Sequence, residues 1–252
     1  DLTIYTNIFA CSLTVDSGSG EVIVPSNVTL TVSNAVITSG NLRFKNNSSL
    51  VQVNDDPLIN SGNISYERTT TPLFRKDYVY WSTPVSPQTL GALSPSSSFI
   101  YSNDGTKWVA EAKTKPMLIG NGYIIRAPDN YYVAGTRQVF DGVFIGKPNN
   151  GALEGLPLAE KKSYVIGNPY PSALDADKLL DTNKMLDGTI YFWTHNTPAK
   201  VVVSNQYSSD DYASYNSSGG VSAKSDPDHN DDPTSTLDKK PTGKIAAGQA
   251  FY

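Results

Sequence analysis

The chain has 252 residues, of which 38% are hydrophobic and 17% charged, with a formal net charge of −4 at pH 7. A chain of this composition folds, and its acidic balance and scattered Lys and Arg argue against a phosphate-binding surface and a nucleic-acid partner. No apolar run approaches the roughly 20 residues that span a bilayer, so no transmembrane segment is expected.

The choice of residues predicts an all-β fold. Tyr is abundant at 15 and Met scarce at 2, and the polar share consists of Ser, Thr, Asn, Asp and Gly, which favour turns and exposed strand faces. The single cysteine, Cys11, excludes an internal disulfide framework and a cysteine-rich zinc site. It alternates with Phe9 and Leu13, and we expect a small buried core residue.

Residues 1–76 form the first predicted segment, a series of short strands. Stretches such as "EVIVPSNVTLTV" and "AVITSGNLRF" alternate apolar and polar residues and are separated by Ser, Gly and Asn. The spacing of about ten residues suits a short β-solenoid or a meander, and a plain sandwich sheet is the alternative. In a solenoid, Val28, Leu30 and Val32 would point inward in one layer, and Leu42 and Phe44 in the next. Such a segment is too short to stand alone, so it should stack on its neighbour.

Residues 77–252 contain an internal repeat, which predicts a β-sandwich-like region with two related halves. Each copy runs as an apolar strand, a Pro-rich corner, an aromatic strand and a Gly-containing kink before another strand. The copies are "YVYWSTPVSP", "FIYSNDGTKW" and "MLIGNGYIIRAP" in residues 78–128, then "YVIGNPYPSA", "TIYFWTHN" and "GKIAAGQAFY" in residues 164–252. We expect "VFDGVFIGKPNNG" to be a closing strand and the second copy to be truncated at the C-terminus.

One short helix is predicted, in "SALDADKLLDTNKML". Ser172 could cap it, and Asp175 and Asp177 would favour its first turn. Asp187 and Gly188 should then turn the chain into a strand over residues 189–194. That strand would bury Ile190 and Phe192 and leave Tyr191 and Trp193 on its other face.

The sequence shows no convincing catalytic group, so we expect a protein that is not an enzyme. There is no Gly-x-Ser-x-Gly motif, and His195 and His229 lie far apart. We expect a loop hydrogen bond or an aromatic neighbour to satisfy His195. Asp104, Asp141 and Asp187 each precede Gly in a turn, and no pair of carboxylates suits glycoside hydrolysis.

A long insertion, residues 198–242, distinguishes the second copy. Loops of this length are functional or disordered, so ligand recognition is one hypothesis. In "DPDHNDD" the side chains of Asp226, Asp228, Asn230 and Asp232 alternate like calcium ligands, but the Gly and the bidentate Glu of a calcium loop are missing. We favour an acidic solvated loop, keep calcium as the alternative, and expect no other cofactor.

Five aromatic residues are candidates for stacking on a sugar: Trp81, Trp108, Trp193, Tyr131 and Tyr132. Since most Trp residues of a β domain lie in its core, a core position is favoured and a carbohydrate-binding face is the alternative.

Several phrases are unusual in combination, among them "NPYPSALDADK", "DGTIYFWTHN", "YSSDDYASYN" and "GKIAAGQAFY". Together with "YWSTPVSP" and "GNGYIIRAP" they resemble a β-rich region of large secreted proteins of flavobacteria and other Bacteroidota, which lies upstream of the C-terminal signal for the type IX secretion system. The resemblance covers residues 50–252 and carries no catalytic residues.

The resemblance implies a non-catalytic stalk or adhesin module, exported across the outer membrane of a Gram-negative bacterium to the cell surface or the medium. Some such proteins are associated with gliding motility. The implied partners are the outer-membrane secretion machinery in transit and then an extracellular polysaccharide or surface. A part of a secreted polysaccharide-degrading enzyme, or a carbohydrate-binding module, is the alternative. We expect the chain to be a piece of a longer protein.

Overall fold

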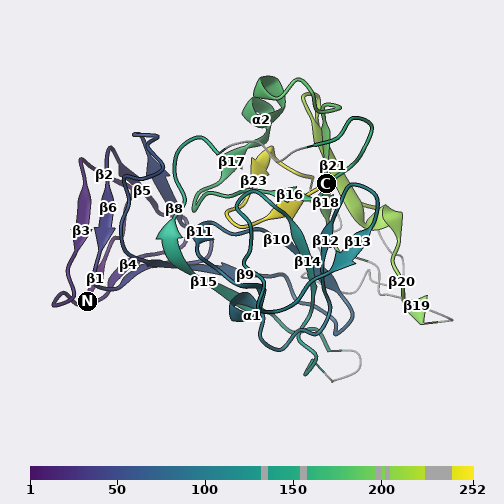
Figure 1. Ribbon diagram of the computed structural model, residues 1–252, viewed down its shortest axis with the longest axis horizontal. Coiled ribbons are helices and arrows are strands. Elements are labelled where there is room, and N and C mark those ends of the chain that lie inside the picture. Colours follow the sequence, from purple (N-terminus) through teal and green to yellow (C-terminus); the bar gives the residue numbers. More distant parts are fainter. Residues whose placement is uncertain (132–135, 154–157, 197–199, 202–204, 225–239) are drawn as a thin grey trace.

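The computed structural model describes residues 1–131, 136–153, 158–196, 200–201, 205–224 and 240–252 (Figure 1). The fold is all-β, as the sequence predicts: several sheets, with few and short helices. No described helix has the length and apolar character to cross a membrane.

The N-terminal segment is a β-solenoid, which decides between the solenoid and the meander or sandwich. Leu2 pairs with Val22 and Val22 with Leu42, so one coil takes 20 residues along this face. Each of the three faces is a row of parallel strands. The faces are β1 (Leu2–Thr3), β4 (Val22–Val24), β7 (Leu42–Phe44) and β9 (Ile64–Thr69); β2 (Ile8–Ala10), β5 (Thr29–Val32) and β8 (Ser49–Gln52); and β3 (Leu13–Val15) with β6 (Val36–Thr38). Antiparallel strands from later in the chain extend the first of these sheets.

The layers of the solenoid contain the predicted residues. Those expected to point inward are all buried: Val28, Leu30, Val32, Leu42 and Phe44. Asn27 and Asn47 occupy the same corner of successive coils with φ of 65° and 64°. Asn is among the few residues that adopt this left-handed conformation readily, so its place at the corners has a backbone reason.

The prediction for Cys11 is wrong, because its side chain is exposed. Cys11 lies on the bend between β2 and β3, where the chain turns outward. Its sulfur accepts a hydrogen bond from the Asn34 side chain at 3.4 Å.

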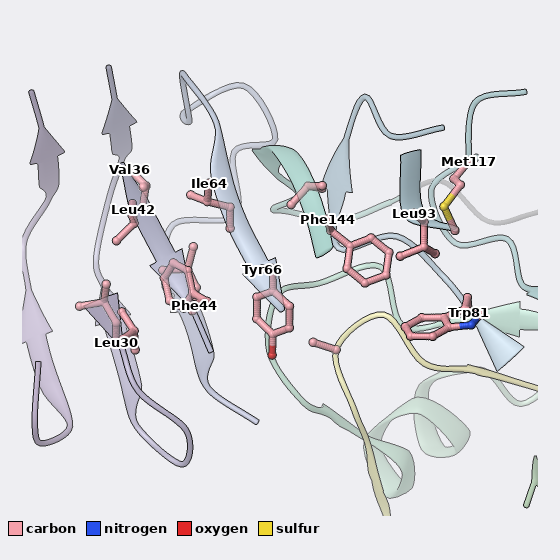
Figure 2. Packing of buried hydrophobic residues seen from close by; sticks show 14 of the residues in the cluster. Leu30, Val36, Leu42, Phe44, Ile64, Tyr66, Trp81, Leu93, Met117 and Phe144 are labelled. Atoms are coloured by element: carbon pink, nitrogen blue, oxygen red, sulfur yellow. The ribbon is translucent and has the colours of Figure 1, made fainter. Parts of the chain in front are cut away.

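The solenoid continues into the rest of the molecule through a shared sheet and a shared core. β15 (Asp141–Pro148), the predicted closing strand, pairs antiparallel with β9 and with β11 (Val85–Ser86). Figure 2 shows the core running from Leu30 and Phe44 to Phe144 and Trp81 without a break. One hydrophobic cluster therefore crosses the expected boundary at residues 76 and 77.

Two related sheets follow the solenoid. The first has the order β10 (Tyr78–Trp81), β14 (Tyr123–Arg126), β12 (Ile100–Asn103), β13 (Trp108–Ala110). In the second, β16 (Ile166–Gly167) pairs with β24 (Ala250–Phe251), and β18 (Thr189–Trp193) pairs with β21 (Tyr212–Asn216), which pairs with β22 (Gly219–Val221). Tyr191 and Tyr252 exchange two backbone hydrogen bonds that connect these pairs. The resulting order, β16–β24–β18–β21, corresponds strand by strand to the first sheet.

The corners of the two sheets also correspond. Thr83 and Asn168 are fully buried, and each accepts a hydrogen bond from the backbone N–H two residues later. The kinks before β14 and β24 each contain a glycine with positive φ, 80° at Gly120 and 65° at Gly248. These shared details give the Pro-rich corners and Gly kinks of both copies the same structural role.

The two sheets join by a reciprocal exchange of backbone hydrogen bonds. The Ser82 N–H donates to the Gly248 carbonyl at 2.8 Å, and the Gly167 N–H donates to the Gly120 carbonyl at 3.0 Å. Since Ser82 and Gly167 occupy equivalent positions, the join has the character of a two-fold axis. The approach is so close that a Cβ on Gly167 would lie 2.2 Å from the Ser82 Cβ.

The helices differ in part from the prediction. α2 (Ala176–Thr182) forms where one helix was expected, but Asp175 caps it in place of Ser172. The reason is that Leu174–Asp175 form a short strand, β17, paired with β23 (Lys244–Ile245), so the helix begins later. A second helix, α1 (Leu90–Leu93), was not predicted. The burial of Ile190 and Phe192 on one face of the strand, with Tyr191 and Trp193 on the other face, is confirmed.

The insertion is shorter than predicted. β21 and β22 lie inside residues 198–242 and belong to the second sheet, where β21 is the counterpart of β13. The other elements described in this stretch are β19 (Lys200–Val201), β20 (Asn205–Gln206) and the 3-10 helix η1 (Ser209–Asp211).

The close approach at Gly167 predicts a large cost for a single added methyl group. Gly167→Ala should lower the free energy of unfolding by about 3 kcal/mol or more, because the new Cβ meets Ser82. Combining it with Ser82→Gly should recover a large part of that loss, a coupling that urea unfolding of the two single variants and the double variant measures. Gly18→Ala, with open space around its Cβ, is the control. A Gly167→Ala variant as stable as the control would contradict the close join.

Candidate functional site

An aromatic cleft of about 520 Å³ lies where the two sheets meet. The first sheet and the second copy both contribute to it, together with Ile124 and the serines of the turn before β21. Its aromatic residues are Tyr78, Tyr80, Tyr101, Trp108, Trp193, Tyr207 and Tyr212.

The period of the strands brings these rings to one side. On β10, Tyr78 and Tyr80 face the cleft, whereas Val79 and Trp81 face the main core. On β18, Trp193 faces the cleft and Phe192 faces the core beneath the second sheet. The cleft is therefore the aromatic face of two related sheets, brought together by their join.

The rings are fixed by contacts with one another. Tyr80 and Trp193 stack with their centroids 6.1 Å apart and their planes 10° from parallel. The Trp108 ring meets Tyr80 edge-on at 6.3 Å. The hydroxyl groups of Tyr80 and Tyr212 form a hydrogen bond. Trp108 is nevertheless 41% exposed and Tyr207 36%, so ring surface is available to a ligand.

The described residues that line the cleft include no Asp, Glu, Lys or Arg. Burial raises the pKa of Tyr207 to about 12, and burial also raises the pKa values of Tyr78 and Tyr80. These phenols therefore stay protonated. The Tyr207 hydroxyl donates to the Lys76 carbonyl at 2.9 Å, and its oxygen can still accept a hydrogen bond. A neutral, aromatic surface with hydroxyl groups at its edge suits a neutral, hydroxylated ligand.

The structure separates the five predicted sugar-stacking residues. Trp108 and Trp193 come together in the cleft. Trp81 takes the favoured core position and not the alternative of a sugar-binding face: it is only 1% exposed and packs between Phe140 and Phe144 on the opposite face of β10. Tyr131 packs against the main core and donates its hydroxyl hydrogen to the Val139 carbonyl, away from the cleft. Tyr132 lies outside the described residues.

Sequence reasoning missed the tyrosines of the cleft. Tyr78 and Tyr80 stand two apart in "YVYW", and this spacing places them on one face of a strand. Tyr212, on β21, was assigned to the insertion loop. The repeat supplied a usable signal, since β21 is the counterpart of β13, which carries Trp108.

A second pocket, of about 550 Å³, shares Tyr80 and Trp193 with the cleft. It is bounded by the last coil of the solenoid, by residues 68–71 and by the second sheet. Its polar lining is rich in Thr, Ser and Asn.

A buried polar cluster stands beside this pocket. The Nε2 atom of His195 is 2.9 Å from the Thr71 hydroxyl, and its Nδ1 atom is 3.6 Å from the Asp77 carboxylate. His195 has a φ of 45°, so the chain holds it in a conformation that L-residues seldom adopt. The expected loop hydrogen bond to His195 is present, although the residue is more enclosed than its place at a strand end suggests.

Burial shifts the pKa values of both ionisable partners. Burial raises the pKa of Asp77 to about 7, with a hydrogen bond from the Phe74 N–H and the charge of Arg137 opposing and the charge of Asp211 adding. Burial lowers the pKa of His195 to about 4, with the charge of Arg137 adding a smaller lowering effect.

The two buried carboxylates do not form an open catalytic pair. Asp77 is 2% exposed and Asp211 is fully buried, and neither lines the cleft or the second pocket. A substrate bound in either space would not touch them, whereas hydrolysis requires an acid within hydrogen-bond reach of the bond that breaks.

The predicted calcium ligands, Asp226, Asp228, Asn230 and Asp232, lie outside the described residues. Within the described part of the chain, no three His, Cys, Asp or Glu side chains gather as a metal site would require. Asp210, a further candidate ligand in the acidic stretch, pairs with Lys224 at 2.8 Å.

Comparison with known proteins assigns a family. Residues 2–252 match the family described as "Domain of unknown function (DUF8693)". The chain belongs to this family. No curated protein and no solved structure matches the chain. The family spans the solenoid and both sheets, so the aromatic cleft and the join that forms it lie within the family domain.

The buried cluster predicts a pH-dependent stability difference. The raised pKa of Asp77 means that its contribution to stability is full below about pH 4 and falls as the pH rises through about 7. His195, with a lowered pKa, contributes the opposite trend between about pH 4 and 6.5. Asp77→Asn should remove the loss of stability with rising pH that Asp77 causes. The new amide oxygen can still accept the hydrogen bond from the Phe74 N–H.

The stability of the Asp77→Asn variant relative to the wild type should therefore rise between pH 5 and pH 8, by about 1 kcal/mol or more. Urea unfolding at both pH values measures the difference. Asp187→Asn, which removes an exposed carboxylate from a turn, is the control. If the difference in stability between Asp77→Asn and the wild type stays constant with pH, Asp77 is ionised in the folded protein without a cost in stability.

Proposed function

We propose that this protein is a non-catalytic glycan-binding module of a secreted or surface-displayed protein, and that the aromatic cleft is its binding site. The observation that carries the proposal is the convergence of seven aromatic side chains, six from the two sheets and Tyr207 from the segment after β20, on one partly open cleft whose described lining is uncharged.

The chemistry of sugars fits this surface. A pyranose ring has an apolar face of C–H groups, and these slightly positive hydrogens pack favourably on the electron-rich face of an aromatic ring. Its hydroxyl groups point outward in the ring plane, where Tyr hydroxyls and the Ser208 and Ser209 side chains border the cleft. Because the tyrosines are locked by mutual contacts, little side-chain entropy is lost on binding.

The resemblance to secreted Bacteroidota proteins supports the location of this activity. A module exported by the type IX secretion system would meet polysaccharide at the cell surface or in the medium, and an adhesin or stalk role follows from binding without turnover. The aromatic cleft supports the proposed binding, and the resemblance supports the proposed compartment.

Polysaccharide hydrolysis is the second candidate. The favouring observation is the raised pKa of Asp77, since a carboxyl group that stays protonated near neutral pH can act as a general acid. Asp77 is buried outside both the cleft and the second pocket, which argues against hydrolysis. Reducing-sugar release from the glycans that bind, abolished by Asp77→Asn without loss of binding, would support the enzyme.

The proposed function predicts the effect of removing one exposed ring. Trp108→Ala should weaken glycan binding about tenfold or more while leaving the fold intact, because Trp108 is an exposed cleft residue and not a core residue. Affinity electrophoresis against a panel of neutral and acidic polysaccharides, followed by calorimetry with the oligosaccharides that retard the protein, measures the loss.

Phe9→Ala is the matched control, since Phe9 is an exposed aromatic residue on the solenoid at 84% exposure and lies outside the cleft. It should bind as the wild type does. Equal retention of the wild type and Trp108→Ala on every polysaccharide of the panel, or no retention of either, would contradict the proposal.

A further inference from the structure

The second pocket has an electrostatic character that the cleft lacks. Its charged lining consists of Arg68, Lys240 and Lys244, and His195 adds a neutral imidazole. No Asp or Glu is among the described residues that line it. Lys244 pairs with Asp175 at 2.7 Å, so among the described lining residues Arg68 and Lys240 remain as charges without a described ion pair.

Arg68 is the central group. It lies on β9 where the solenoid meets the two sheets, with its guanidinium 4.6 Å from the centre of the Trp81 ring. Burial lowers its pKa to about 10, so it remains a cation at neutral pH. It forms no ion pair with any carboxylate of the described chain, although its neighbours on the solenoid, Arg43 and Lys45, both pair with Glu67.

The described hydrogen bonds of Arg68 use only part of the N–H donors of its guanidinium. One of its nitrogens donates to the carbonyls of Tyr80 and Gly248, at 3.2 and 2.7 Å. A guanidinium has five N–H donors. Arg68 lines the second pocket, so we infer that its remaining donors are available to a ligand bound there. An unpaired cation in an enclosed site attracts an anion more strongly than an exposed one, because water screens it less.

We propose that this pocket binds the carboxylate of an acidic sugar, a uronic acid residue, through Arg68 with Lys240 at its rim. A carboxylate is planar and matches the fork of a guanidinium, and Ser, Thr and Asn side chains around it suit the sugar hydroxyls. Tyr80 and Trp193 line both the pocket and the cleft, so the two spaces adjoin. The inference rests on the proposed function, since it assigns a class of glycan to it.

The experiment uses two matched ligands. Pentagalacturonate and its methyl ester differ in the carboxylate alone, and calorimetry at low salt measures both. The acid should bind about tenfold or more tightly than the ester, and 0.5 M NaCl should remove most of the difference.

Arg68→Met keeps a side chain over Trp81 and removes the charge, and it should lose the preference for the acid. Lys240→Ala changes an exposed residue at the rim and should weaken the acid alone, by about threefold. Lys162→Ala, an exposed lysine that does not line the pocket, is the control for loss of one charge. If Arg68→Met fails to fold, the Lys240→Ala variant and the salt dependence decide.

The outcomes separate the two proposals. Equal affinity for acid and ester, with Trp108→Ala abolishing both, overturns the anionic pocket and leaves the cleft. Binding of the acid that requires Arg68 and Lys240 but not Trp108 supports the pocket and overturns the cleft. If the acid binds more tightly than the ester, but neither Lys240→Ala nor salt weakens its binding, the anionic pocket is overturned. Absence of binding to both ligands overturns the uronic acid assignment, and the polysaccharide panel then decides the cleft.

Discussion

The contact between Ser82 and Gly167 is the constraint on which the rest of this structure depends. The two backbones come close enough that a methyl group on Gly167 would overlap the Ser82 side chain. Each strand then donates a hydrogen bond to the glycine kink of the other copy. These kinks require positive φ at Gly120 and Gly248, a conformation that favours glycine. The glycines of the repeat are therefore needed for the join between the sheets as well as for the turns.

From this join the positions of the aromatic residues follow. Alternation along β10 and β18 divides their aromatic side chains between the core and the cleft, and the join brings the two cleft faces together. The cleft thus needs both copies of the repeat, since neither sheet alone presents the stacked pair of Tyr80 and Trp193. The solenoid contributes differently: its last strands supply Arg68, and its core continues into the first sheet (Figure 2).

The parts of the fold that depend on local pattern were predictable from the sequence. Period-two alternation gave the inward layers of the solenoid, and the repeated corners gave the two related sheets. Residues whose environment depends on distant contacts were not predictable in this way. Trp81 and Trp108 are both strand tryptophans, and only the packing of β15 on β9 and β10 buries one and not the other. Helix α2 is capped by Asp175 and begins at Ala176 because a strand some 70 residues later pairs with the predicted first turn. Arg68 was not predicted as a site residue, because nothing in the neighbouring sequence indicates that a cation has no counter-ion in the fold.

The central claim is that a glycan lies across the aromatic faces of the two sheets, and a crystal structure of the protein with a bound oligosaccharide tests it most directly. The ligand is taken from the polysaccharide that retards the protein most. Sugar rings packed on Trp108 and beside Trp193, with hydroxyl groups near Tyr207 and Tyr212, are the predicted result. An oligosaccharide bound elsewhere on the molecule, with the cleft free of sugar, would contradict it.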